Sequence, residues 1–192
     1  MTNQTPYTGK APESAYETLR FIVLALIAAL AVRAFIAQPF VVQGQSMEPT
    51  FHSQDYLVVD KVSYRIGEPA RGDIVVFKSP EDMSQNYIKR VIGLPGETIR
   101  IENQRVSVNG TPLDEQYLSI EDQKRIFGSN GTFSMEQQLG KSEYFVLGDN
   151  RQHSSDSRRW GPLPRQNILG RAILTVFPFA SFGPIERPLY TE

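Results

Sequence analysis

The sequence predicts a mostly β domain that follows a single apolar helix, and two observations support this fold class. Before Pro39, the residues from Phe21 to Val32 form an unbroken run of twelve apolar residues. After Pro39, short blocks rich in β-branched and aromatic residues alternate with Gly, Pro, Asn and Asp, which is typical of successive short strands. The 192 residues are enough for one domain or for two small ones.

The N-terminal segments are predicted from polarity and length. Residues 1–16 are polar and contain two Pro, so we expect a polar tail. Residues 17–38 are predicted to form a transmembrane helix, because Leu19 to Ala37 would measure roughly 28 Å as a helix, close to the ~30 Å hydrocarbon core of a bilayer. The twelve-residue run by itself also fits a cleaved signal peptide or a buried helix. The flanking basic residues do not decide the orientation.

Residues 39–192 are predicted to form the β-rich domain. The pair Asn109-Gly110 is a strong signal for a hairpin turn. Residues of about 102–142 are mostly polar and irregular, which indicates a small insertion, and residues 134–140 within it could form a helix. The expected strands are 56–59, 74–77, 87–92, 97–101, 105–108, 144–147 and 171–177.

Composition excludes several classes of protein and of site. Twenty basic residues face 21 acidic ones without a long block of either sign, which argues against a nucleic-acid partner. The chain has no Cys, so a disulfide framework, a thiolate nucleophile and a Cys-based metal site are excluded. His52 and His153 are the two histidines, too few for a three-histidine metal site. We expect no metal and no other cofactor, and we expect His52 to be a solvated loop residue.

Ser46 and Lys89 are candidates for a nucleophile and its base. Ser46 follows an extended stretch, and a serine becomes nucleophilic only where a nearby group accepts its proton. Lys89 shares one face of a predicted strand with Tyr87 and Val91, and a lysine on an apolar face is unfavourable unless it is neutral or paired. Burial that lowered its pKa from ~10.4 towards neutrality would make it a base. The alternative is a lysine that extends from a strand edge into solvent.

The densest group of polar residues lies between Gly148 and Pro164, directly after an apolar strand. Loop residues at the end of a buried strand are well placed for function. Asp156 and Arg158 could form an ion pair that fixes this loop, and hydroxyl groups there could hold a catalytic group. A solvated turn and a catalytic His153 are the alternatives.

Together these segments resemble the type I signal peptidases, membrane-bound serine proteases that remove signal peptides from exported preproteins. An apolar segment is followed by four motifs in the order that the family shows, and the lysine stands 43 positions after the serine. The motifs are SMEPTF from Ser46, RGDIVVF at 71–77, YIKRVIGLPGE at 87–97 and GDNRQHSSDSRRWG at 148–161. The resemblance implies a signal-peptidase-like antiparallel β-fold with one N-terminal transmembrane helix.

The resemblance also implies roles for single residues. Ser46 matches the nucleophile and Lys89 matches the general base. Ser154 matches a hydroxyl that positions the lysine amine, and Asp156 and Arg158 match a pair that stiffens the site. The backbone N–H of Ser46 would be one oxyanion donor. Some family members add a hydroxyl two residues before the nucleophile; this chain has Gly44 there, as other members do, which leaves the second donor open.

The same resemblance implies a substrate and a location. A preprotein would bind as an extended strand, with small residues of an Ala-x-Ala pattern in shallow apolar pockets. The partners would be preprotein signal peptides and the lipid bilayer, with no nucleic acid and no obligate protein partner. The chain would cross the cell membrane once, with its catalytic domain on the extracytoplasmic side. The residues that match the pocket walls are Val42, Gly44, Met47, Phe51, Tyr87 and Ile88.

Two other classes of function are alternatives to a signal peptidase. Self-cleaving repressors share the Ser and Lys pair, but they carry a DNA-binding domain, for which this N-terminus has no room. A non-catalytic membrane-tethered adaptor could keep the fold, but Ser46 and Lys89 are both intact. The segment 177–185, with three Phe, packs into the core or forms a membrane-facing apolar patch.

Overall fold

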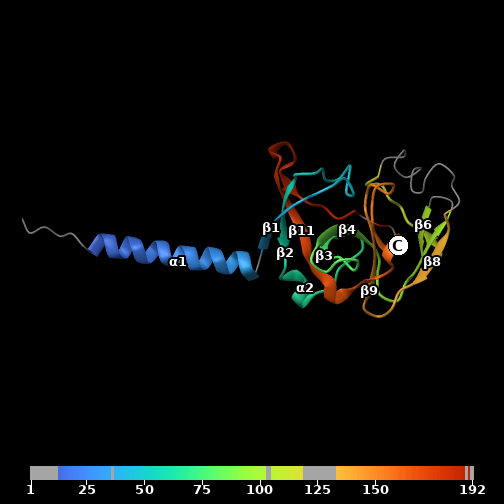
Figure 1. Ribbon diagram of the computed structural model, residues 1–192, viewed down its shortest axis with the longest axis horizontal. Helices are drawn as coiled ribbons and strands as arrows, with labels where there is room; N and C mark the ends of the chain where they lie inside the picture. Colours follow the sequence, from blue (N-terminus) through green and yellow to red (C-terminus); the bar gives the residue numbers. More distant parts are fainter. Residues whose placement is uncertain (1–12, 36, 103–104, 119–132, 189, 191–192) are drawn as a thin grey trace, which may run out of the picture.

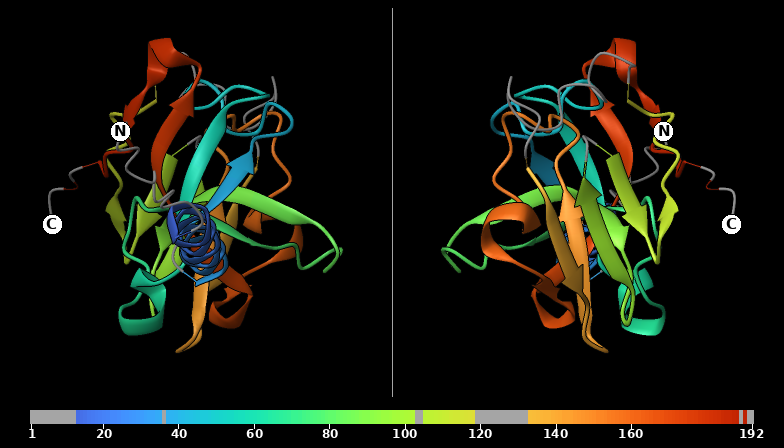
Figure 2. Two further views of the ribbon diagram at one scale, coloured as in Figure 1. Left: turned by 90° about the vertical axis from the view of Figure 1, so that its left-hand side faces the viewer. Right: turned by 90° about the vertical axis from the view of Figure 1, so that its right-hand side faces the viewer.

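The computed structural model describes residues 13–35, 37–102, 105–118, 133–188 and 190. A long helix, α1 (Glu13–Phe35), extends away from a body made almost entirely of antiparallel strands (Figure 1). Figure 2, in its left view, looks along this helix onto the β-rich body. The predicted mostly β fold class with one N-terminal helix is therefore confirmed.

Helix α1 begins and ends a few residues earlier than predicted. Its first residue, Glu13, falls inside the expected polar tail, of which residues 1–12 lie outside the described residues. The helix ends before the predicted residue 38, because the chain from Ala37 onward pairs as a strand and Pro39 cannot continue a helix. The side chains of residues 15–30 are exposed. Among the described residues, no helix combines the length and apolarity that a membrane crossing requires.

The larger sheet has the strand order β1-β2-β11-β3-β4-β9-β10, with β12 paired to β11, and all of its pairings are antiparallel. Strand β11 lies between β2 and β3, so a segment from near the C-terminus holds the first half of the domain together. The strands are β1 (Ala37–Val41), β2 (Tyr56–Asp60), β3 (Ile74–Lys78), β4 (Asn86–Gly93), β9 (Glu143–Leu147), β10 (Leu163–Pro164), β11 (Ile168–Phe177) and β12 (Gly183–Pro184).

The smaller sheet has the order β7-β6-β5-β8, and its strands β6, β7 and β8 lie within the predicted insertion of about 102–142, whereas β5 precedes it. The expected turn at Asn109-Gly110 joins β6 and β7, with positive φ at both residues, as a two-residue hairpin requires. The helix considered at 134–140 is wrong: that segment contains β8, which pairs with β5. The strands are β5 (Thr98–Glu102), β6 (Arg105–Val108), β7 (Thr111–Pro112) and β8 (Met135–Gln138).

Strand β4 is central to the core because its side chains enter three different apolar clusters. Ile88 packs with the residues of β2 and the segment after β1, Val91 packs with β3 and β9, and Ile92 packs with the smaller sheet. Each of these three side chains is at most 5% exposed. A polar side chain on β4 is therefore surrounded by protein. The short helices are α2 (Ser63–Ile66), α4 (Ser157–Trp160), η1 (Arg165–Asn167) and η2 (Phe179–Ser181).

Candidate active site

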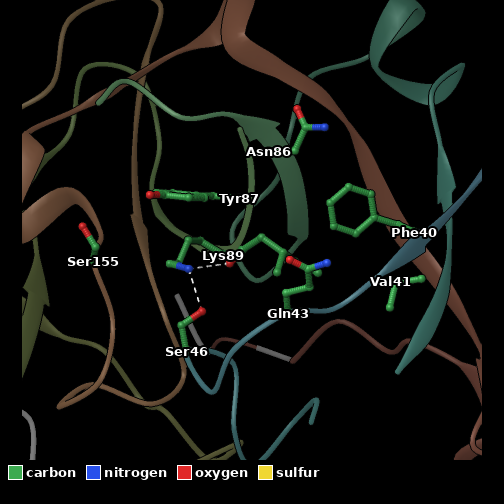
Figure 3. A pocket seen from close by; sticks show the side chains of 9 residues that line it. Phe40, Val41, Gln43, Ser46, Asn86, Tyr87, Lys89 and Ser155 are labelled. Carbon is green, nitrogen blue, oxygen red and sulfur yellow. Dashed lines mark hydrogen bonds between the residues drawn. The ribbon is translucent and has the colours of Figure 1, made fainter. Parts of the chain in front are cut away.

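The structure brings Ser46 and Lys89 into direct contact, as Figure 3 shows. The amine Nζ of Lys89 lies 2.8 Å from Ser46 Oγ, and it also donates to the carbonyl oxygen of Ile88 at 2.8 Å. Ser46 is half-buried, whereas Lys89 is only 4% exposed. A serine hydroxyl and a lysine amine within hydrogen-bonding distance can pass a proton between them.

The position of Ser46 results from backbone hydrogen bonds on both sides of the turn that follows β1. Val42 N–H donates to Asp55 and Val42 C=O accepts from Gln54 N–H, both at 2.9 Å, so the extended chain continues past β1. The carbonyl of Ser46 accepts from Asn150 N–H at 3.1 Å, which ties the turn to the loop after β9. Among the described residues, no acceptor takes the backbone N–H of Ser46, so this group is available as an oxyanion donor.

The position of Lys89 on β4 lowers the pKa of its amine. The strand pairs with β3 beside Lys89, with Val75 as its register partner, and Tyr87 and Val91 flank it on the same face. Burial lowers the pKa of Lys89 from 10.5 to about 8, and Arg158 acts in the same direction, while Asp156 acts against it. A useful fraction of the amine is therefore neutral close to pH 8.

Asp156 organises the loop that follows β9. Its carboxylate caps α4 by accepting from Arg158 N–H at 3.3 Å, and it also accepts from Gly148 N–H at 3.0 Å. The guanidinium of Arg158 binds both oxygens of Asp156 at 2.7 Å. One buried carboxylate thus joins the two ends of the loop. The structure forms the ion pair that the sequence suggested.

Ser154 differs from the expectation. Its hydroxyl is buried, but it makes no hydrogen bond to Lys89 or to any other described group. It lies against Gly148, where an added Cβ would be 2.2 Å from Ser154 Oγ and 2.4 Å from the carbonyl oxygen of Ser46. Packing against the Gly148 backbone holds this hydroxyl near Ser46, so the predicted bond to the lysine amine is absent from this structure.

A second buried ion pair beside the dyad was missed by the sequence reasoning. Arg90 donates to both oxygens of Asp149, at 2.9 and 2.7 Å, and Thr50 Oγ1 donates to the same carboxylate at 2.6 Å. The exposed fractions of the Arg90 and Asp149 side chains are 3% and 0%. The signal was available in part, because the alternation along β4 places Arg90 on the opposite face from Lys89, and a buried arginine requires a partner.

A cleft of about 490 Å³ opens beside the dyad. Of the six residues predicted to line it, only Tyr87 and Ile88 do so. The residues that line the cleft are Phe40, Val41, Gln43, Ser46, Asn86, Tyr87, Ile88, Lys89 and Ser155.

The other predicted pocket residues lie elsewhere for identifiable reasons. Val42, Met47 and Phe51 are at most 3% exposed and pack with Ile88 in one core cluster, behind the cleft wall. The chain alternates after β1, so Val41 and Gln43 line the cleft while Val42 points into the core. Gly44 is exposed, with φ of +85°, and donates its N–H to Ser53 Oγ at 3.3 Å. This left-handed backbone favours glycine over serine or threonine.

The two histidines take no part in this arrangement. His52 and His153 are both exposed and lie outside the set of residues that line the cleft. Within the described ranges, no group of three His, Cys, Asp or Glu side chains is arranged to hold a metal ion.

Comparison with known proteins gives the family. Residues 15–177 match the signal peptidase family, peptidase S26. The chain belongs to the signal peptidase family. It is 38% identical to a signal peptidase I of Leptolyngbya laminosa over 93% of this chain and 88% of that protein. It is 39% identical to a probable signal peptidase I-1 of Synechocystis over 88% of this chain and 86% of that protein.

A solved structure is also similar. The crystal structure of a signal peptidase I from Enterococcus faecalis is 34% identical, has a TM-score of 0.48, and covers 55% of this chain and 97% of that one.

Signal peptidases of this family are serine proteases that cleave the signal peptides of preproteins, and they are membrane-associated in bacteria. The present chain is therefore an endopeptidase of the serine class, and the repressor alternative is excluded.

Proposed function

We propose that Ser46 is the nucleophile and Lys89 the general base of this signal peptidase. The observation that carries the proposal is the 2.8 Å contact between Lys89 Nζ and Ser46 Oγ in a buried setting. A neutral amine at this distance can accept the serine proton as Oγ attacks the carbonyl carbon of the scissile bond. An exposed or charged lysine could not act as this base.

The remaining steps follow from the same contact. The negative charge of the tetrahedral intermediate would face the backbone N–H of Ser46. The protonated amine of Lys89 then gives its proton to the leaving nitrogen, so that the mature protein departs and an acyl-enzyme on Ser46 remains. Lys89, again neutral, takes a proton from the water that hydrolyses the ester. This sequence requires neither a metal ion nor an organic cofactor.

The edges of two strands support binding of the substrate as an extended chain. Among the described strands, β1 pairs with β2 on one side only, and the first part of β4 pairs with β3 alone, because pairing with β9 begins at Arg90. Phe40, Val41 and Gln43, together with residues 86–88, line the cleft and are next to these free edges. A signal peptide can add to them as a strand. Tyr87, Ile88 and Phe40 line the cleft with large apolar side chains, which supports a preference for small substrate side chains such as those of an Ala-x-Ala pattern.

The pH dependence of cleavage tests the proposed base. Because Lys89 must be neutral and its pKa is about 8, kcat/KM should rise about tenfold per pH unit below pH 8 and level off above it. The measurement is preprotein cleavage between pH 5.5 and 9.5. A His52→Gln, His153→Gln double variant serves as the control and should keep this profile. An inflection near pH ~6.5 that disappears in the double variant would assign the base to a histidine instead.

We also propose that the apolar N-terminal segment, of which α1 is the described part, anchors the protein in the bilayer as a single span, with the β-rich domain on the extracytoplasmic side. The exposed apolar side chains of α1, including Phe21, Ile22 and Leu24, support an apolar surrounding. In sealed membrane vesicles with a cytoplasmic-side-in orientation, added protease should degrade the β-rich domain. Full protection of that domain, or its release by high salt, would contradict the proposed anchoring.

A further inference from the structure

The cleft has a polar border at Ser155, across the Ser46–Lys89 dyad from β1. In Figure 3, Ser155 lies on one side of the Ser46–Lys89 pair, whereas Phe40 and Val41 lie on the other. Under the proposed function, the signal peptide occupies the side of β1, since its free edge is there. The chain that leaves after cleavage therefore passes Ser155. In that arrangement, the side chains around Ser155 would meet the first residue of the mature protein.

Ser155 is bound to a carboxylate from a different part of the chain. Its Oγ donates to Glu81 Oε2 at 2.9 Å. Glu81 belongs to the turn between β3 and β4, and Ser79 Oγ accepts from Glu81 N–H at 3.2 Å and from Asp82 N–H at 3.3 Å. Hydrogen bonds within the turn and one across to Ser155 therefore fix the place of the Glu81 carboxylate at the edge of the cleft.

The charge of Glu81 is only weakly compensated. Arg159 Nε lies 3.2 Å from Glu81 Oε1, but the Arg159 side chain is 73% exposed and that of Glu81 is 33% exposed. Such a pair is strongly screened by water, and it leaves a negative potential at this border. Since the hydroxyl proton of Ser155 is directed to Glu81, it is not available to an incoming substrate carboxylate.

We propose that Glu81, held by Ser155, makes this peptidase discriminate against an acidic residue directly after the cleaved bond. This inference rests on the proposed Ser46–Lys89 function, which fixes the position of the scissile bond. An aspartate at that position meets the Glu81 carboxylate, whereas asparagine has the same shape without the charge. Arg159 lowers the discrimination, because it partly neutralises Glu81.

The test compares two preproteins that differ only by Asp or Asn at the first mature position. The wild-type protein should cleave the Asn substrate with a kcat/KM about two- to fivefold higher, the size expected for a solvent-exposed charge pair. Glu81→Gln should bring the ratio to about one, and Arg159→Ala should increase it. Loss of folding cannot produce these opposite changes. Glu136→Gln is the matched control, because Glu136 is an exposed glutamate paired with Arg100 on the smaller sheet.

The outcomes separate this inference from the proposed function. If the wild-type protein cleaves both substrates with the expected ratio and Glu81→Gln abolishes it, the inference is supported. If both substrates are cleaved but the ratio is one, or Glu81→Gln leaves it unchanged, the inference is wrong and the dyad stands. If Glu136→Gln changes the ratio equally, the effect is not local and the inference is overturned. If neither substrate is cleaved, the proposed function itself fails.

Discussion

Ser46→Ala and Lys89→Met are each expected to abolish preprotein cleavage, by at least ~10⁴-fold, while the β-rich domain still folds. The first variant removes the attacking oxygen, and the second removes the group that accepts its proton at 2.8 Å. Lys89→Arg should be equally inactive, since a guanidinium does not become neutral in proteins. Cleavage is measured with a preprotein that carries a small-residue site. Ser107→Ala, on a strand of the smaller sheet, is the control that keeps full activity.

The stability of Lys89→Met distinguishes lost chemistry from lost structure. In the folded protein the pKa of Lys89 is about 8, against 10.5 ordinarily, so folding disfavours the charged form. Below pH 8 Lys89 is protonated in both the folded and the unfolded state, so the full cost of burying its charge lowers the stability of the wild-type protein. Between pH 8 and 10.5 the unfolded state binds more protons than the folded state, so wild-type stability rises with pH. At pH 7 the variant should be more stable by about 3 kcal/mol. Thermal unfolding of an inactive Lys89→Met below the wild-type temperature would contradict this account.

Asp149→Ala is expected to lower the free energy of unfolding by about 3–5 kcal/mol, because it leaves the Arg90 guanidinium buried without its carboxylate. Thr50 also loses the acceptor of its hydroxyl. Denaturant unfolding measures the effect. Glu136→Gln, which breaks an ion pair whose side chains are more than half exposed, should cost about 1 kcal/mol or less. An equal loss of unfolding free energy in the two variants would show that burial of the Arg90–Asp149 pair does not determine its contribution to stability.

The strands were predictable because their residues alternate between two environments. Along β4, Tyr87 and Val91 enter one cluster while Ile88 enters another, and this period of two is visible in the sequence. The hairpin at Asn109-Gly110 was equally predictable, since few residue pairs adopt positive φ at both positions. Lys89 stood out for the same reason, as a charge in an apolar pattern.

The features that were missed depend on contacts between distant segments. Arg90 and Asp149 are 59 positions apart in the sequence, and no local sequence pattern predicts that they pair. To predict which residues line the cleft, one must know which side chains after β1 face the cleft and which face the core. Backbone hydrogen bonds of Val42 with Gln54 and Asp55 determine this, and the residue types do not. The hydroxyl of Ser154 was assigned to the lysine by resemblance, whereas its position depends on the shape of the backbone at Gly148.

The most direct test of the Ser46–Lys89 dyad is to identify the residue that a hydroxyl-directed acylating probe modifies. The purified protein is treated with the probe at pH 8, and the modified peptide is located by mass spectrometry. The dyad predicts one acyl group on Ser46, with labelling lost in Lys89→Met and retained in Ser107→Ala. Modification of Ser154 or Ser155 in place of Ser46, or labelling of Ser46 that persists unchanged in Lys89→Met, would contradict it.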